Sequence, residues 1–165
     1  MAELARGSED ALRELLRRYE RPLAGYLRRQ TRDRDAEDLF QEVWLRVVRS
    51  ARSFDRNARF RPWLYRIAFN VFRDWCGRDA AKEQGGEIDA AADPPEREGA
   101  ALDAERLLAA LSREQRDVVA LRYWLDLSEA EMSEVLGIPR GTVKSRLHAA
   151  MTRLSALARD DGERS

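Results

Sequence analysis

The feature that most limits how this chain can fold is a stretch near its middle, residues 79–101. It carries Gly85-Gly86 and Pro94-Pro95 and has almost no large apolar side chain. Such a segment cannot bury enough apolar surface to offset the entropy lost on ordering it. We therefore expect a flexible acidic linker, residues 79–101, that divides the 165 residues into an N-terminal unit, residues 1–78, and a C-terminal unit, residues 102–165.

Both units show the apolar periodicity of helices, which predicts an all-α protein with two small helical domains. Three helices are expected in the first domain, over residues 9–29, 36–52 and 62–78. Four are expected in the second, over residues 102–111, 113–123, 129–136 and 140–157. Capping residues support these starts: Ser8 precedes the first helix, and Ser112 and Ser128 are each followed three residues later by Gln or Glu.

Charge is balanced overall but not along the chain. The protein has 30 Lys and Arg against 30 Asp and Glu. The first 78 residues carry a net +6, the linker −5, and residues 135–159 hold five cations and no acid. Two basic stretches separated by an acidic spacer indicate a polyanionic partner. The cancelling charges also predict that the free protein binds DNA weakly.

Several classes of protein are disfavoured. A single cysteine, Cys76, excludes an internal disulfide, and with His148 as the one histidine the chain has no basis for a metal centre or a catalytic triad. We expect no cofactor and no enzymatic activity. Neither a secretory signal nor a membrane span is apparent, so we expect a cytoplasmic protein without direct membrane insertion.

The C-terminal unit contains a helix-turn-helix pattern. The turn is Gly137-Ile138-Pro139, between two short apolar stretches. The last helix has an apolar arc and an opposite arc of small and polar residues flanked by cations, as a helix in the major groove requires. The candidate DNA-binding residues are Arg140, Gly141, Thr142, Lys144, Ser145, Arg146, His148 and Arg153.

The third helix of the N-terminal unit has a different surface. Apolar residues cover about two-thirds of it, and we expect most of them in the core. The remaining arc of the helix and the preceding loop, residues 53–61, place a tryptophan indole among guanidinium groups and amides. Such a group is a suitable platform on which an unpaired base can stack. The candidates are Asn57, Arg59, Phe60, Arg61, Trp63, Arg66, Asn70 and Arg73.

These strings carry a family resemblance. Residues 136–147 (LGIPRGTVKSRL), preceded by residues 111–119 (LSREQRDVV), resemble region 4 of the extracytoplasmic-function (group IV) sigma factors of bacterial RNA polymerase. Residues 35–43 (DAEDLFQEV) and 60–74 (FRPWLYRIAFNVFRD) resemble the polymerase-binding and promoter-melting segments of region 2. The motifs occur in the family's order on both sides of the linker.

The resemblance implies a role for each segment. Asp38, Gln41, Glu42 and Leu45 would dock on core RNA polymerase, the third helix and its loop would melt and hold the minus-ten element, and the last helix would read the minus-thirty-five element. It further implies promoter DNA as a partner, and an anti-sigma factor that controls an alternative sigma factor for stress or envelope signals. The linker would be either a plain tether or an acidic mimic of nucleic acid inside the polymerase.

Two other functions stay open at this point. A self-sufficient helix-turn-helix regulator would bind DNA as a dimer without polymerase. A sigma mimic would titrate an anti-sigma factor and start no transcription. The polymerase-docking string disfavours the first, and the retained face of Trp63, Arg66, Asn70 and Arg73 disfavours the second.

Overall fold

The computed structural model describes residues 1–55, 57–84 and 107–162. Within these ranges the protein is all-helical, as the sequence predicts. The elements are α1 (Ala2–Ala5), α2 (Glu9–Thr31), α3 (Ala36–Ser50), a 3₁₀ turn η1 (Ala51–Ser53), α4 (Phe60–Gln84), α6 (Arg113–Tyr123), α7 (Glu129–Leu136) and α8 (Arg140–Gly162). None of the described helices combines the length and the apolar character needed to cross a bilayer.

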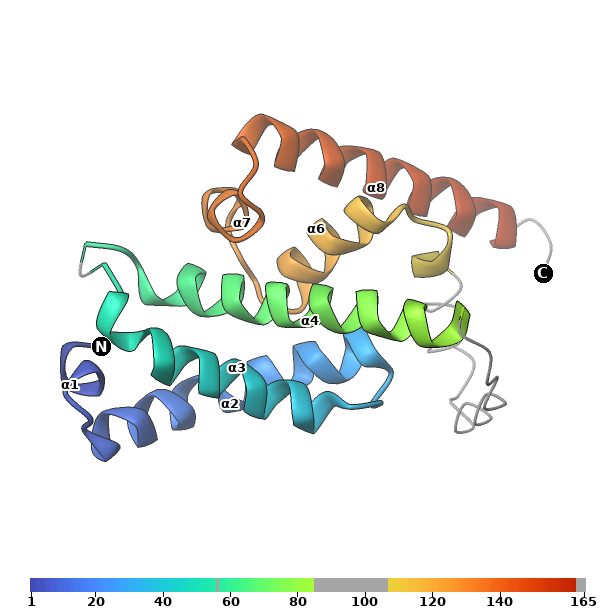
Figure 1. Ribbon diagram of the computed structural model, residues 1–165. Helices are drawn as coiled ribbons and strands as arrows, with labels where there is room; N and C mark the ends of the chain where they lie inside the picture. Colours follow the sequence, from blue (N-terminus) through green and yellow to red (C-terminus); the bar gives the residue numbers. More distant parts are fainter. Residues whose placement is uncertain (56, 85–106, 163–165) are drawn as a thin grey trace.

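Helix α4 lies at the centre of the molecule. Figure 1 shows it between α2 and α3 on one side and the group of α6, α7 and α8 on the other. Its closest helical neighbours are α7 and α3. This position explains the breadth of its apolar surface, because a helix that packs on two sides needs two apolar faces. Leu64, Tyr65 and Ala68 are all fully or almost fully buried.

The buried side chains form one cluster that runs through both halves of the chain. It includes Leu27 and Val47 from α2 and α3, Leu64 from α4, and Leu121 and Met132 from α6 and α7. A smaller cluster, around Leu111, Val119 and Ala150, fixes α8 on α6. The two units separated in the sequence thus share a hydrophobic core.

The predicted starts of α2, α6 and α7 agree with the structure. Ser8 accepts a hydrogen bond from the Ala11 amide at 3.3 Å. Ser112 with Gln115, and Ser128 with Glu131, each form a complete capping box. Because these side chains satisfy amides that the first turn leaves unpaired, they determine where α2, α6 and α7 begin.

The ends of several elements differ from the prediction. Helix α4 begins at Phe60, two residues before the expected Pro62, and continues to Gln84, so residues 79–84 of the predicted linker are helical. Helix α8 extends to Gly162, and α3 gives way to a 3₁₀ turn at residue 51. The sequence analysis did not anticipate α1, whose Leu4 is buried in the core. Boundaries carry weaker signals than periodicity, because one or two extra residues change little apolar burial.

Two predictions fall largely outside the described residues. The first is the linker, of which residues 85–101 lie outside the described residues. The second is the helix expected over residues 102–111, of which the structure describes residues 107–111 and shows 107–109 as helical.

Candidate nucleic-acid interface

The surface of α4 that faces away from its two apolar sides presents polar residues in one row. Arg66, Asn70 and Arg73 are exposed at intervals of three or four residues, the helical repeat. Asn57 is exposed in the loop that precedes α4, where its backbone N–H donates a hydrogen bond to the Asp55 carboxylate at 2.9 Å. The structure therefore leaves these predicted site residues accessible on the N-terminal half.

Trp63 is part of an aromatic cluster and not a free-standing platform. Its ring centroid lies 4.9 Å from that of Phe54 and 5.8 Å from that of Phe60, and Phe60 in turn packs 5.3 Å from Tyr19. Phe60 and Trp63 are each half-buried. The surface available for stacking a base at this point is thus smaller than the sequence suggested, since packing uses part of both rings.

Three of the predicted DNA-binding cations contact the C-terminal half. Arg61 forms an ion pair with Glu131 at 3.1 Å, Arg73 forms one with Asp117 at 3.4 Å, and Arg59 forms one with Glu134. The hydrogen bond that the exposed Arg59 guanidinium donates to Glu134 raises the pKa of Arg59. The fold therefore brings together cations of the loop and α4 with acids of α6 and α7, which no local sequence pattern revealed.

The turn between α7 and α8 has the conformation that its sequence predicts. Gly137 has a positive φ of 67°, and the Ser133 hydroxyl donates a hydrogen bond to the Ile138 carbonyl at 2.6 Å. Val143 and Ala150 are completely buried, so the opposite arc of α8 faces outward. Exposed on α8 are the predicted residues Arg140, Gly141, Lys144, Ser145 and His148.

The remaining candidates of α8 are less accessible or have a structural role. Thr142 and Arg146 are half-buried. Arg153 is exposed, but its Nε donates a hydrogen bond to the Ala110 carbonyl at 2.8 Å and so ties α8 to the segment before α6. Hydrogen bonds to its own backbone amide and to Ser112 lower the pKa of Glu114, and the charge of Arg146 lowers it further. Arg146 and Arg153 thus lie toward α6.

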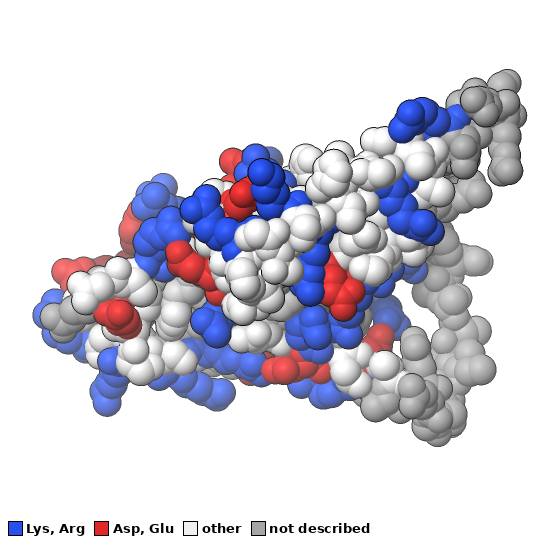
Figure 2. Space-filling view, turned by 90° about the horizontal axis from the view of Figure 1, so that it is seen from above, with Lys and Arg blue, Asp and Glu red and all other residues white. Residues whose placement is uncertain are grey.

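Figure 2 looks down on the side of the molecule that carries α8. Lys and Arg outnumber Asp and Glu on this face, but they are spread among uncharged residues and do not form one patch. Such a surface would attract a polyanion without holding it tightly.

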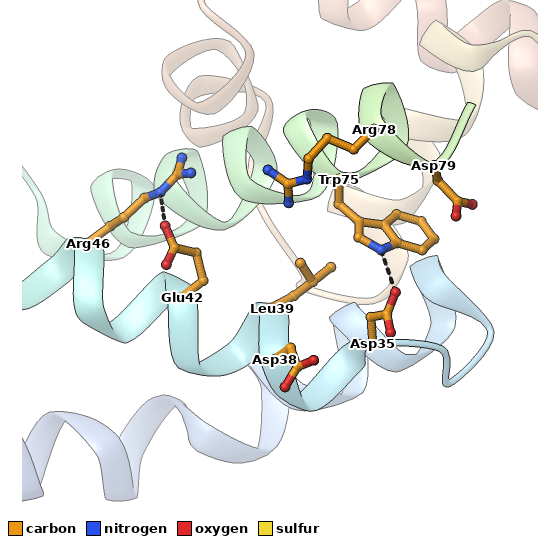
Figure 3. Close-up of a pocket in the computed structure, with 8 residues that line it drawn as sticks. All are labelled: Asp35, Asp38, Leu39, Glu42, Arg46, Trp75, Arg78 and Asp79. Atoms are coloured by element: carbon orange, nitrogen blue, oxygen red, sulfur yellow. Dashed lines mark hydrogen bonds and ion pairs between the residues drawn. The ribbon is translucent and has the colours of Figure 1, made fainter. Parts of the chain in front are cut away.

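A hollow of about 510 Å³ lies between α3 and the C-terminal part of α4, shown in Figure 3. Two of the predicted polymerase-docking residues, Asp38 and Glu42, line it. The other lining residues, none of which is among the predicted docking residues, are Asp35, Leu39, Arg46, Trp75, Arg78 and Asp79. Asp35 and Leu39 lie in the string 35–43 that resembles the polymerase-binding segment, and Arg46 is four residues from Glu42 on the same helix.

Contacts within the hollow fix its shape. The Trp75 indole Nε1 donates a hydrogen bond to the Asp35 carboxylate at 2.9 Å, which joins α4 to the start of α3. Arg46 pairs with Glu42 at 2.7 Å and with Asp74 at 3.0 Å. The hydrogen bond that the Arg46 guanidinium donates to Glu42 is the main cause of the raised pKa of Arg46.

Beside this hollow, the outer face of α3 carries the other two predicted docking residues. Gln41 is exposed, and Leu45 retains 49% of its accessible surface. Val48, at 44%, adds a second exposed apolar side chain to the same stripe. Two exposed aliphatic residues beside acidic ones are typical of a protein-binding surface. In the described residues, no group of three or more His, Cys, Asp or Glu side chains could hold a metal ion.

Comparison with known proteins shows which family the chain belongs to. Residues 15–82 match the model of Sigma-70 region 2, and residues 101–154 match that of Sigma-70 region 4. The chain is 30% identical to the ECF RNA polymerase sigma-E factor of Haemophilus influenzae, over 87% of this chain and 85% of the relative. The chain belongs to the extracytoplasmic-function sigma factors.

Other relatives of this sigma factor support the assignment. It is 33% identical to the ECF RNA polymerase sigma factor SigM of Mycobacterium tuberculosis, over 92% of this chain and 79% of the relative. Among solved structures, CnrH in complex with the cytosolic domain of CnrY is similar with a TM-score of 0.73 and 28% identity, over 97% of this chain and 95% of CnrH. RpoE of Bartonella quintana, in complex with the anti-sigma factor NepR, has a TM-score of 0.72 and 25% identity, over 89% and 96%.

The sigma factor is therefore a transcription initiation factor and not an enzyme, as the sequence analysis expected. Its two conserved regions lie on either side of the linker in the predicted order. This comparison favours the sigma factor over the stand-alone helix-turn-helix regulator, because region 2 has no place in such a regulator.

Proposed function

We propose that this sigma factor divides promoter recognition among three surfaces, with residues 1–78 acting as region 2 and residues 102–165 as region 4. The outer face of α3 docks on core RNA polymerase. The loop before α4 and the polar row of α4 open and hold the minus-ten element. The exposed arc of α8 reads the minus-thirty-five element. The observation that supports this proposal is that each surface exposes several of its predicted side chains: Gln41 and Leu45 on α3, Arg66 and Asn70 on α4, and Lys144 and Ser145 on α8.

The docking proposal is supported by the stripe on α3. Asp38, Gln41 and Leu45 lie three and four residues apart, so they form one row, with Glu42 beside it at the hollow. An exposed leucine among carboxylates suits a partner that offers both an apolar contact and cations. Substituting Asp38 with Arg should therefore weaken polymerase binding without unfolding the helix.

The proposal for the minus-ten element is supported by the row on α4. Arg66 and Asn70 are exposed, and an arginine with an amide can hold a backbone phosphate and a base edge together. Trp63 contributes the part of its half-buried ring that remains exposed, with Phe54 and Phe60 packed against it. Substituting Arg66 with Ala should slow promoter opening.

Control of this sigma factor follows from its relatives by analogy. RpoE of Bartonella quintana is bound by an anti-sigma factor in its solved structure. We propose that an anti-sigma factor likewise covers the stripe and hollow of α3 in this protein. Because core polymerase is cytoplasmic in bacteria, the proposed site of action is the cytoplasm.

The test is transcription in vitro with purified core polymerase of the same organism and fragmented genomic DNA, with sequencing of the RNA 5′ ends. We expect a small set of discrete starts that depend on this protein. Absence of discrete starts, together with capture of an anti-sigma factor, would favour the sigma mimic instead.

Matched variants separate the three surfaces. Asp38→Arg should reduce polymerase binding, whereas Glu37→Arg, in the same exposed first turn of α3, should not. Arg66→Ala should lower open-complex formation with normal polymerase binding, whereas Arg17→Ala, an exposed cation of α2, should behave as wild type. If both members of a pair behaved alike, the corresponding surface would be wrongly assigned.

A further inference from the structure

The cations proposed to hold the minus-ten strand are in part already occupied by the other half of the protein. Arg59, Arg61 and Arg73 each pair with an acid of α6 or α7. Arginine binds phosphate and carboxylate through the same planar fork of donors. A carboxylate that sits on such an arginine therefore occupies the position that a DNA phosphate would take.

Of these three arginines, Arg61 has the most of its donors used by acceptors of the C-terminal half. Besides the ion pair with Glu131, its Nη2 donates hydrogen bonds to the Leu125 carbonyl at 2.6 Å and the Asp126 carbonyl at 3.0 Å. Three acceptors from the C-terminal half thus surround one guanidinium. An arginine held in this way has few donors left for a phosphate.

The acids are placed for these contacts by the structure of α7. Glu131 accepts hydrogen bonds from both the backbone and the hydroxyl of Ser128, at 2.9 Å each, in the capping box. Burial raises the pKa of the Glu131 carboxyl, but these hydrogen bonds and the charge of Arg61 outweigh it and lower the pKa below its usual value. Glu131 is therefore charged at neutral pH.

Apolar contacts hold the same interface together. Trp124, which follows α6, packs its ring 6.5 Å from that of Tyr26, and the Arg29 guanidinium lies over it at 5.9 Å. Leu125 and Met132 are buried in the core that includes Leu64 and Tyr65 of α4. The contact between the two halves is thus extensive and does not depend on ion pairs alone.

We propose that this contact is autoinhibitory: in the free sigma factor, α6 and α7 of region 4 act as an internal substitute for promoter DNA on the cations of region 2. This inference rests on the proposed role of Arg59, Arg61 and Arg73 in binding the minus-ten strand. Region 4 must leave α4 before the strand can bind, so the closed form keeps the free protein from engaging DNA until a partner separates the halves.

The test uses the full-length double variant Glu131→Gln/Glu134→Gln. Glutamine at position 131 keeps the capping box, since Gln115 fills the same role at the start of α6. The ion pairs of Glu131 with Arg61 and of Glu134 with Arg59 are both lost. The control is Asp126→Asn/Glu129→Gln, which removes two charges next to the same helix from side chains that make none of the ion pairs to α4 described above. Thermal melts confirm that both variants fold.

Two measurements are made without polymerase: the radius of gyration by small-angle X-ray scattering, and the affinity for a short fluorescein-labelled single-stranded DNA of mixed sequence. Exposed ion pairs contribute up to about 1 kcal/mol each. We expect the double variant to bind the strand about fivefold more tightly than the control, the change that about 1 kcal/mol produces. Both proteins should expand when the strand is bound, because region 4 has to leave α4 first.

Equal affinities of the double variant and the control would overturn the proposal. So would tighter binding without expansion of the complex with DNA, because the strand would then bind while region 4 still lies on α4. These outcomes are independent of the proposed function: a failure to produce discrete transcripts with core polymerase would contradict the sigma activity of this chain, whereas the scattering would still decide whether the acids close the molecule.

Discussion

Asp117 is the buried carboxylate of α6, and its environment does not favour the charge it carries. Burial raises its pKa above the ordinary value, while Arg73 and Arg113 act in the opposite direction. A raised pKa means that the folded state binds the proton more tightly than the unfolded state does, so the charged form costs stability at neutral pH.

From this we predict that Asp117→Asn is at least as stable as wild type at pH 7. As the pH falls through the folded pKa of Asp117, the wild-type carboxyl becomes neutral, and the difference in Tm between the two proteins should shrink. Thermal melts of both proteins between pH 7 and pH 4 check this. An Asp117→Asn protein that is less stable than wild type at pH 7, with the deficit disappearing toward acid pH, would mean that the charge interaction with Arg73 outweighs the burial.

A second prediction at the residue scale concerns the hydrogen bond from Trp75 to Asp35, which joins two sides of the proposed docking hollow. Trp75→Phe keeps the stacking on Phe72, whose ring lies 6.0 Å away, but removes the donor. A net loss of about 1 kcal/mol is expected.

A double-mutant cycle of Trp75→Phe with Asp35→Ala in urea unfolding measures this coupling. The cycle is needed because Asp35 has a positive φ of 53°, where alanine is itself unfavourable. Asp35→Asn serves as the control, since an amide oxygen still accepts the bond and Asn tolerates this conformation. A coupling near zero would show that the hydrogen bond does not stabilise the protein.

At the scale of elements, two glycines of the helix-turn-helix have opposite roles. Gly137 ends α7 with φ +67°, whereas Gly141 lies inside α8 and has open space where a Cβ would be added. Gly137→Ala should therefore destabilise the fold by about 1 kcal/mol, and Gly141→Ala should stabilise it by about 0.5 kcal/mol, since glycine is a poor helix residue.

For Gly141→Ala, promoter binding should change in the opposite direction to stability. Gly141→Ala places a methyl group on the exposed arc of α8 and should reduce binding of holoenzyme to the upstream promoter element, despite the gain in stability. Urea unfolding gives the stabilities, and footprinting of the holoenzyme on its promoters gives the binding. Normal protection of the upstream element by Gly141→Ala would place the DNA contact elsewhere on α8.

At the scale of the whole molecule, the shared core predicts cooperative unfolding. Tyr65 and Met132, from opposite halves, belong to one buried cluster. Trp124→Phe leaves tryptophans only in the first half, at positions 44, 63 and 75. Fluorescence then reports the first half alone, while far-UV circular dichroism reports both.

We expect the two urea curves of Trp124→Phe to coincide, because neither half buries its face of the core when the other has unfolded. Separate midpoints would indicate that the halves fold independently and that the closed contact is weak. Wild-type protein, followed by circular dichroism, shows whether the substitution itself loosens the contact.

The fold could be predicted from the sequence to a large extent, because its signals are local. The caps at Ser8, Ser112 and Ser128, and the glycine at position 137, act on their own backbone and determine where helices begin and end. The apolar spacing of each helix shows which side is buried. Local patterns also identified the exposed arc of α8 and most of the row on α4.

The sequence by itself determined the helices, the family and the candidate residues, since each rests on neighbours along the chain. Only the tertiary structure decided which residues distant in the sequence contact each other. It placed Glu131 and Glu134 on the arginines that the sequence assigned to DNA, and Trp75 beside Asp35. These pairs join residues 40 to 75 positions apart. Only packing through the common core brings such residues together, because no local pattern specifies a contact across that distance.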